Sequence, residues 1–145
     1  MIILGIDPGV KTGWALYDTD CLAVVDMWET DGGVQGVVDH MKDFTEPYDK
    51  MVVERFELRP DVRYPNLTPR NVIGWFQGEG YKFDLVMPAT HKKVVKDADI
   101  RQSKLMAGYK IGKGHTRDAL RLTLYYAMAK LKHEPTIRLV KPNVE

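Results

Sequence analysis

The first stretch of the chain, MIILGIDPGVKTGWALYD, constrains the fold more than any other part of the sequence. The mostly apolar run from Ile2 to Ile6 predicts a buried strand, and it ends in a single acid, Asp7. Pro8 and Gly9 follow at once and suit a tight turn, because proline presets φ and glycine accepts positive φ. Thr12 to Tyr17 is then predicted to form a second strand. Asp7 therefore lies on rigid backbone, where an unpaired buried carboxylate is costly unless it binds something.

The order of the remaining predicted elements favours a mixed sheet with helices on both faces. Further strands are predicted at residues 22–28, 51–53 and 83–87, and helices at 33–45, 68–78, 91–96, 100–107 and 116–132. Three strands in succession indicate an antiparallel meander, whereas strands that alternate with helices indicate parallel pairing. We therefore expect a five-stranded α/β domain over residues 1–132. The tail at 133–145 is expected to be either disordered or an added strand.

Charge is distributed unevenly along the chain. Residues 1–90 carry 8 Lys+Arg and 15 Asp+Glu, a net of −7, whereas residues 91–145 carry 13 and 5, a net of +8. A basic region of this kind is either a nucleic-acid footprint or a solvated face. No apolar run approaches the ~20 residues that span a bilayer. The single cysteine, Cys21, fits a reducing compartment, so we expect a cytoplasmic protein that does not bind membranes.

The candidate chemistry lies at three sites, which are Asp7, Glu54 and the pair His115 and Asp118. Glu54 ends the strand at 51–53 as Asp7 ends the first strand, and parallel pairing would place their backbones about 4.8 Å apart. His115 and Asp118 stand at i and i+3, on one face of the start of the last long helix. Three carboxylates held together repel one another, and a divalent cation removes that penalty. Oxygen ligands suit Mg²⁺ or Mn²⁺.

Each of these four residues also has a simpler interpretation, as a turn former, a loop acid, a helix-start acid or a histidine without a ligand role. Glu57 is most simply a solvated loop acid, although it lies close enough to Glu54 in the chain to substitute for it. The remaining histidines are expected at the surface, and they are His40, His91 and His133.

The chain resembles the RuvC-like Holliday junction resolvases, a branch of the RNase H-like superfamily. The resemblance rests on GIDPG and TGW in the first two strands, on Glu54, and on His115, Asp118 and Ala119 in the last long helix. It follows the element order over residues 1–132 but is specific only at these short sites. It implies an RNase H-like fold and two Mg²⁺ or Mn²⁺ ions held by Asp7, Glu54, His115 and Asp118. It also implies that a homodimer nicks branched DNA symmetrically across a four-way junction.

The sequence departs from the family pattern after Glu54. The family usually has an aromatic residue three positions after the glutamate, where this chain has Glu57, and Phe56 lies one position earlier. The following loop lacks the usual asparagine-containing pattern and carries arginines instead. These departures bear on junction selectivity more than on metal chemistry. They would suit a divergent member from a phage-infected host as well as one from a bacterial cell.

Basic and aromatic side chains near the site are candidates for DNA binding. Phosphate contacts from lysine and arginine give affinity that is independent of sequence and sensitive to salt. Phe56 or Tyr64 could stack on an unpaired base, although Phe56 could equally pack in the core. The helix at 68–78, with Trp75 and Phe76, is the candidate dimer interface. The basic candidates are Arg59, Arg63, Lys92, Lys93, Lys96, Lys104, Lys110, Lys113, Arg117 and Arg121.

The first functional hypothesis is a metal-dependent, structure-selective DNA endonuclease that resolves four-way junctions. The alternatives are a nuclease with broader branched or flap specificity, a non-catalytic accessory protein that binds branched DNA, and an RNA-cleaving member with similar carboxylates. An ATPase of the same superfamily would need phosphate-binding glycine loops in a second, duplicated domain. The 145 residues of this sequence leave no room for such a domain.

Overall fold

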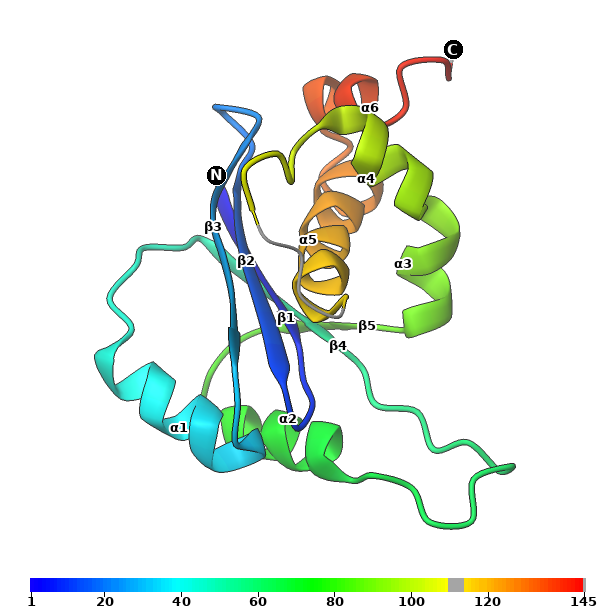
Figure 1. The fold of residues 1–145 in the computed structure, drawn as a ribbon. Coiled ribbons are helices and arrows are strands. Elements are labelled where there is room, and N and C mark those ends of the chain that lie inside the picture. The colour runs from blue at the N-terminus through cyan, green and yellow to red at the C-terminus, as the bar shows by residue number, and fades with distance from the viewer. Residues whose placement is uncertain (110–113, 145) are drawn as a thin grey trace.

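The structure is a computed structural model that describes residues 1–109 and 114–144. The strands are β1 (Ile2–Asp7), β2 (Thr12–Asp18), β3 (Ala23–Thr30), β4 (Lys50–Glu54) and β5 (Asp84–Val86). The helices are α1 (Gly33–Asp43), α2 (Thr68–Gly78), α3 (Pro88–Val94), α4 (Asp97–Ser103), α5 (His115–Tyr125) and α6 (Glu134–Val140), and the π-helical turn η1 (Tyr126–Lys130) continues α5. Figure 1 shows their arrangement.

The described strands form one sheet in the order β3-β2-β1-β4-β5. β1 pairs antiparallel with β2, and β2 pairs antiparallel with β3. On its other side β1 pairs in parallel with β4, which in turn pairs in parallel with β5. This arrangement confirms the predicted mixed sheet, and it places β1 at the centre, between the antiparallel and the parallel halves.

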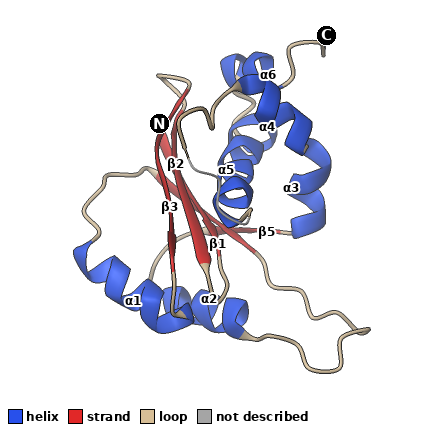
Figure 2. Cartoon of the chain, in the orientation of Figure 1, coloured by secondary structure: helices blue, strands red, loops and turns tan. Residues whose placement is uncertain are grey.

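Helices cover both faces of the sheet, as predicted (Figure 2). Each face has its own hydrophobic core. On one face Leu4 and Trp14 pack with Val37 of α1 and Phe76 of α2. On the other face lie α5, α3, α4 and α6, and there Ile3 packs with buried side chains of α5. The alternation along β1 explains this division, because successive side chains of a strand point to opposite faces.

Two glycines allow α5 to lie directly against the centre of the sheet. A Cβ added at Gly5 in β1 would come within 2.2 Å of the carbonyl oxygen of Ala119, and one at Gly13 in β2 within 2.2 Å of that of His115. Any side chain at either position would therefore force the helix away. These contacts give the glycines of GIDPG and TGW a packing role in placing the start of α5.

Several boundaries differ from the sequence-based expectations. α3 begins at Pro88 rather than at residue 91, which is favourable because the missing N–H of proline costs nothing in a first helical turn. α4 begins at Asp97 rather than at residue 100, and the carboxylate of Asp99 accepts a hydrogen bond from the Lys96 N–H at 2.8 Å. Residue 115, expected just before the last long helix, is its first residue.

The C-terminal tail contains a helix, α6, where the sequence suggested disorder or an added strand. The side chain of His133 caps this helix by accepting a hydrogen bond from the Thr136 N–H. Thr136 is itself buried, and its hydroxyl lies 3.0 Å from the Tyr17 hydroxyl of β2. Short polar contacts of this kind join residues far apart in sequence, so local sequence patterns do not reveal them.

Within residues 1–109 and 114–144, helices long and apolar enough to cross a membrane are absent.

Candidate active site

Two strand ends bring the first two candidate acids together. Asp7 is the last residue of β1 and Glu54 the last residue of β4. The parallel register pairs Ile6 with Val53, so the two acids occupy the next positions of neighbouring strands. Backbones of paired strands lie about 4.8 Å apart. The sheet therefore presents two carboxylates at one edge, on rigid backbone.

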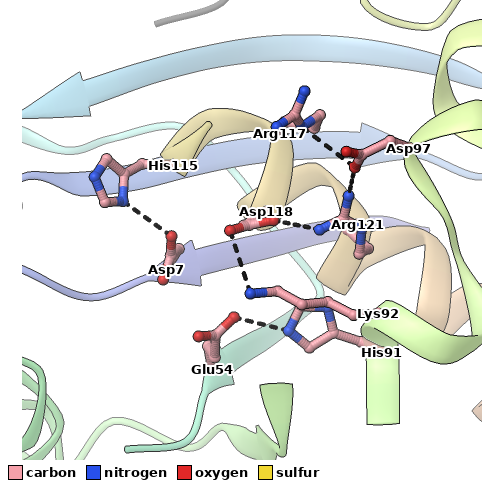
Figure 3. A network of polar contacts seen from close by, with 9 residues as sticks. All are labelled: Asp7, Glu54, His91, Lys92, Asp97, His115, Arg117, Asp118 and Arg121. Atoms are coloured by element: carbon pink, nitrogen blue, oxygen red, sulfur yellow. Dashed lines mark hydrogen bonds and ion pairs between the residues drawn. The ribbon is translucent and has the colours of Figure 1, made fainter. Parts of the chain in front are cut away.

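The start of α5 lies over this edge. His115 and Asp118 occupy the first turn of the helix, which Gly13 allows to approach β2. The Nδ1 atom of His115 lies 3.1 Å from a carboxylate oxygen of Asp7, as Figure 3 shows. The four residues proposed from the sequence thus come from three elements and meet at one end of the sheet.

Asp7 has the most perturbed electrostatics of the group. Burial raises its pKa from 3.8 to about 7, and the negative charges of Glu54 and Asp118 act in the same direction. The hydrogen bond from His115 opposes this rise by stabilising the carboxylate. A carboxyl group that resists ionisation beside two other acids indicates a concentration of negative charge that a cation would relieve.

A residue missed by the sequence analysis holds Glu54. His91 was expected at the surface, but its side chain on α3 is 0% exposed, and its Nε2 lies 2.7 Å from a carboxylate oxygen of Glu54. The sequence does hold a weak indication that His91 is buried. Val94 and Val95 stand at i+3 and i+4 from it, and residues at these spacings share a helix face. Val95 is fully buried, so that face points inward.

The other two histidines that we expected at the surface, His40 and His133, are half-buried rather than exposed. His40 accepts a hydrogen bond from the indole N–H of Trp28 at 3.1 Å, and His133 caps α6. Neither is near the acidic group. Their placement follows from aromatic packing and from helix capping, which involve partners that the local sequence does not reveal.

Asp118 is held by basic side chains. Arg121 donates hydrogen bonds both to Asp118 and to Asp97, the first residue of α4. Lys92 lies 3.7 Å from the other carboxylate oxygen of Asp118. The guanidinium of Arg121 was a candidate for DNA contact, but its side chain is only 5% exposed and both its terminal nitrogens are paired. The structure therefore assigns Arg121 to the acids rather than to DNA.

The fold is shared with solved Holliday junction resolvases. A structure of RuvC from T. thermophilus in complex with a Holliday junction substrate is 15% identical, with a TM-score of 0.60, covering 92% of this chain and 97% of that one. The fowlpox virus Holliday junction resolvase is 17% identical, with a TM-score of 0.57, covering 89% and 99%. This is a RuvC-like fold. No protein-family model matches the chain, and no curated protein has a significantly similar sequence.

A RuvC-like fold raises the question of whether these residues suit a divalent cation. Three carboxylates and an imidazole are donors of the right kind for Mg²⁺ or Mn²⁺. The raised pKa of Asp7 supports this fit. Among the described residues, however, no three His, Cys, Asp or Glu side chains form a ready-made metal site. Figure 3 shows Glu54 hydrogen-bonded to His91 and Asp118 hydrogen-bonded to Arg121, so an ion would have to compete with both partners.

Basic side chains line two hollows that border the acids. A hollow of about 550 Å³ beside Asp118 is lined by Lys92, Lys96 and Arg117, among others. A smaller one of about 190 Å³ beside Glu54 is lined by Arg59, Phe56, Glu57 and again Lys92. Lys92 thus borders both hollows. These surfaces combine positive charge with access to the acidic group, as phosphate binding requires.

The remaining candidates lie farther out or point inward. Lys93 and Lys104 are exposed, and Arg63 packs on the exposed ring of Tyr64 in the loop between β4 and α2. Lys110 and Lys113 lie outside the described residues. Phe56 is half-buried and packs against the core under α1 and α2, in line with its alternative interpretation. The candidate interface residue Phe76 is fully buried in the same core, so it is not available to a partner, and Trp75 is half-buried.

Proposed function

We propose that this chain is a metal-dependent, structure-selective DNA endonuclease that resolves four-way junctions. The observation that carries the proposal is the meeting of Asp7, Glu54, His115 and Asp118 at one end of a RuvC-like sheet. The fold neighbours support the choice of substrate, because solved structures show both T. thermophilus RuvC and the fowlpox virus resolvase in complex with Holliday junction DNA.

The four site residues would hold two Mg²⁺ or Mn²⁺ ions. Bound ions of this kind generate a hydroxide-like nucleophile at neutral pH and stabilise the charge that develops on a phosphodiester. Support comes from the donor types and from the pKa of Asp7, which burial and the charges of Glu54 and Asp118 raise. A protein nucleophile is not needed for this chemistry, so the side chains act by holding, orienting and charge balance.

The chain's own residues divide this work. Asp7 and Glu54 stand on the rigid strand ends, which fixes their spacing. His91 orients Glu54 through its 2.7 Å contact, and His115 contacts Asp7 through Nδ1. The second ring nitrogen of His115, Nε2, is then the atom that could hold or release a proton near the substrate.

Lys92 and the lysines and arginines around it would contact DNA phosphates. Each phosphate contact releases counterions, so binding should weaken steeply with salt. The loop between β4 and α2, which begins directly after Glu54, extends away from the sheet in Figure 1. Tyr64 on that loop is 83% exposed and is available to stack on an unpaired base. Symmetric nicking needs two sites related by a two-fold axis, so a homodimer is part of the proposal.

The decisive experiment uses one labelled four-way junction, with linear duplex and flap DNA as competitors. The unchanged protein, Asp7→Asn and Asp39→Asn are incubated with Mg²⁺, with Mn²⁺ and with a chelator. Asp39 is an exposed acid on α1, so its variant is the matched control for loss of one negative charge. We expect paired symmetric nicks that disappear with the chelator and with Asp7→Asn but persist in Asp39→Asn. Cutting that persists in Asp7→Asn would refute the assigned site.

The same assay separates the two alternatives. Equal cutting of junctions and flaps would keep the nuclease and discard the narrow substrate. Junction binding without cutting under every metal would favour a non-catalytic accessory protein. That second function has one observation in its favour, which is that Glu54 and Asp118 are each bonded to a basic group of the chain.

A further inference from the structure

Arg121 joins two acids that lie on different helices. It stands on α5 and donates hydrogen bonds to Asp118 on the same helix and to Asp97 at the start of α4, as Figure 3 shows. Its side chain is 5% exposed, whereas that of Asp97 is 49% exposed and that of Asp118 is 22% exposed. The buried cation therefore has one partner in the candidate active site and one outside it.

We propose that Arg121 pairs with Asp118 when no divalent cation is bound. When Asp118 binds a divalent cation instead, Asp97 remains as the partner of Arg121. Asp97 is then a positioning residue, because it acts on the metal site only through Arg121. This inference rests on the proposed function, since it assumes that Asp118 binds the cation.

The physical reason lies in the burial of Arg121. A guanidinium inside the protein that loses its only carboxylate is left as an unpaired buried charge, which is strongly destabilising. The planar fork of arginine carries five N–H donors and can hold two carboxylates at once. With Asp97 present, Asp118 can leave and Arg121 still has a partner. Without Asp97, the release of Asp118 would strand the buried charge, so Asp118 would be less available to an ion.

The other charges in the network have smaller roles in this exchange. Lys92 lies 3.7 Å from Asp118 on an exposed side chain, and Arg117 lies 3.5 Å from Asp97. Ion pairs in which one partner is exposed are weaker than buried ones, because water solvates that partner once the two separate. Lys92 can therefore release Asp118 at little cost, and Arg121 is the group that governs its release.

The test is calorimetric titration of DNA-free protein with Mn²⁺, which reports binding without any cleavage. Asp97→Asn should weaken Mn²⁺ binding about fivefold, the factor that corresponds to one half-exposed ion pair. Arg121→Met, which keeps the bulk of the side chain, should strengthen binding because the competing cation is gone. In the double variant, Asp97→Asn should change the affinity by less than about twofold relative to Arg121→Met alone, because it has no partner left to act through.

The double variant distinguishes this exchange from simple electrostatics. If Asp97 attracted the ion directly, its removal would weaken binding equally with and without Arg121, and that result would overturn the inference. Asp99→Asn is the matched control on α4. Asp99 pairs with Lys141 rather than with Arg121, so its variant should leave Mn²⁺ affinity unchanged.

Two further readouts keep the test decisive. Circular dichroism melts in chelator check folding, and if Arg121→Met does not fold, Arg121→Lys replaces it, since a single ammonium cannot bridge two carboxylates in the same way. Asp7→Asn, titrated alongside, should abolish binding under the proposed function. If the unchanged protein binds no Mn²⁺, the proposed function fails and this inference fails with it. If it binds Mn²⁺ and Asp97→Asn binds equally well, only this inference fails.

Discussion

Replacing Asp7 with asparagine should stabilise the metal-free protein while destroying its proposed activity. Asp7 is buried at the end of β1, and burial, Glu54 and Asp118 all disfavour its charged form. Asparagine has nearly the same shape and no charge, and its side-chain oxygen can still accept a hydrogen bond from His115. The substitution therefore removes an electrostatic penalty without opening a cavity.

The size and the pH range of this effect follow from the pKa of Asp7. The pKa rises from 3.8 to about 7 on folding, which at about 1.36 kcal/mol per pKa unit corresponds to a penalty of at most about 4 kcal/mol. Between these two values the folded state binds more protons than the unfolded state, so stability falls as the pH rises. The penalty is absent below about pH 4 and complete above about pH 7. Since this figure is an upper bound, we expect Asp7→Asn to gain about 1–3 kcal/mol at pH 8.

Urea denaturation in chelator at pH 5 and at pH 8 measures this directly. Asp7→Asn should gain more stability over the unchanged protein at pH 8 than at pH 5. Asp39→Asn, which neutralises an exposed acid, should differ by less than about 0.5 kcal/mol at both values. Equal or lower stability of Asp7→Asn at pH 8 would show that the acids do not repel one another in the ion-free protein. The proposed cation site would then lose its electrostatic basis.

Three other perturbations test the packing, the orientation of one ligand and the DNA surface. Gly13→Ala should lower the free energy of unfolding by about 2–4 kcal/mol, measured by thermal or urea unfolding, because its Cβ would meet the backbone of α5 at 2.2 Å. The control Gly74→Ala lies on α2 with open space around it and should be neutral or stabilising. His91→Leu removes the partner of Glu54 and should weaken Mn²⁺ binding by about tenfold in calorimetry, with His91→Gln restoring part of it. Lys92→Ala should lower the slope of log affinity for a four-way junction against log salt by about one, measured by fluorescence anisotropy.

The elements that carry the chemistry were predictable because their signals are local. An apolar run closed by an acid marks both β1 and β4, so the positions of Asp7 and Glu54 at strand ends follow from the sequence. The glycines of the first two strands were noted only as parts of motifs. Their role in admitting α5 depends on the backbone of residues more than 100 positions away, which no local pattern reports.

The partners of the acids were not predictable for the same reason. His91 contacts Glu54 across 37 positions and Arg121 contacts Asp97 across 24. A histidine beside two lysines in a basic stretch looks like a surface residue, and an arginine in the same stretch looks like a phosphate ligand. Burial decides otherwise in both cases, and burial of a polar side chain is a property of the tertiary packing.

Each of the three acids has a basic partner among the described residues. These partners differ in how readily they can release the carboxylate. Asp7 faces His115, Glu54 faces the fully buried His91, and Asp118 faces Arg121. A histidine ring nitrogen can itself contact a cation, but a guanidinium carries only N–H donors and a fixed positive charge. The two histidines could therefore stay beside a bound ion, whereas Arg121 would need another acid as its partner. Asp97 meets this need, because among the described residues it is the only second carboxylate bonded to any of these three partners.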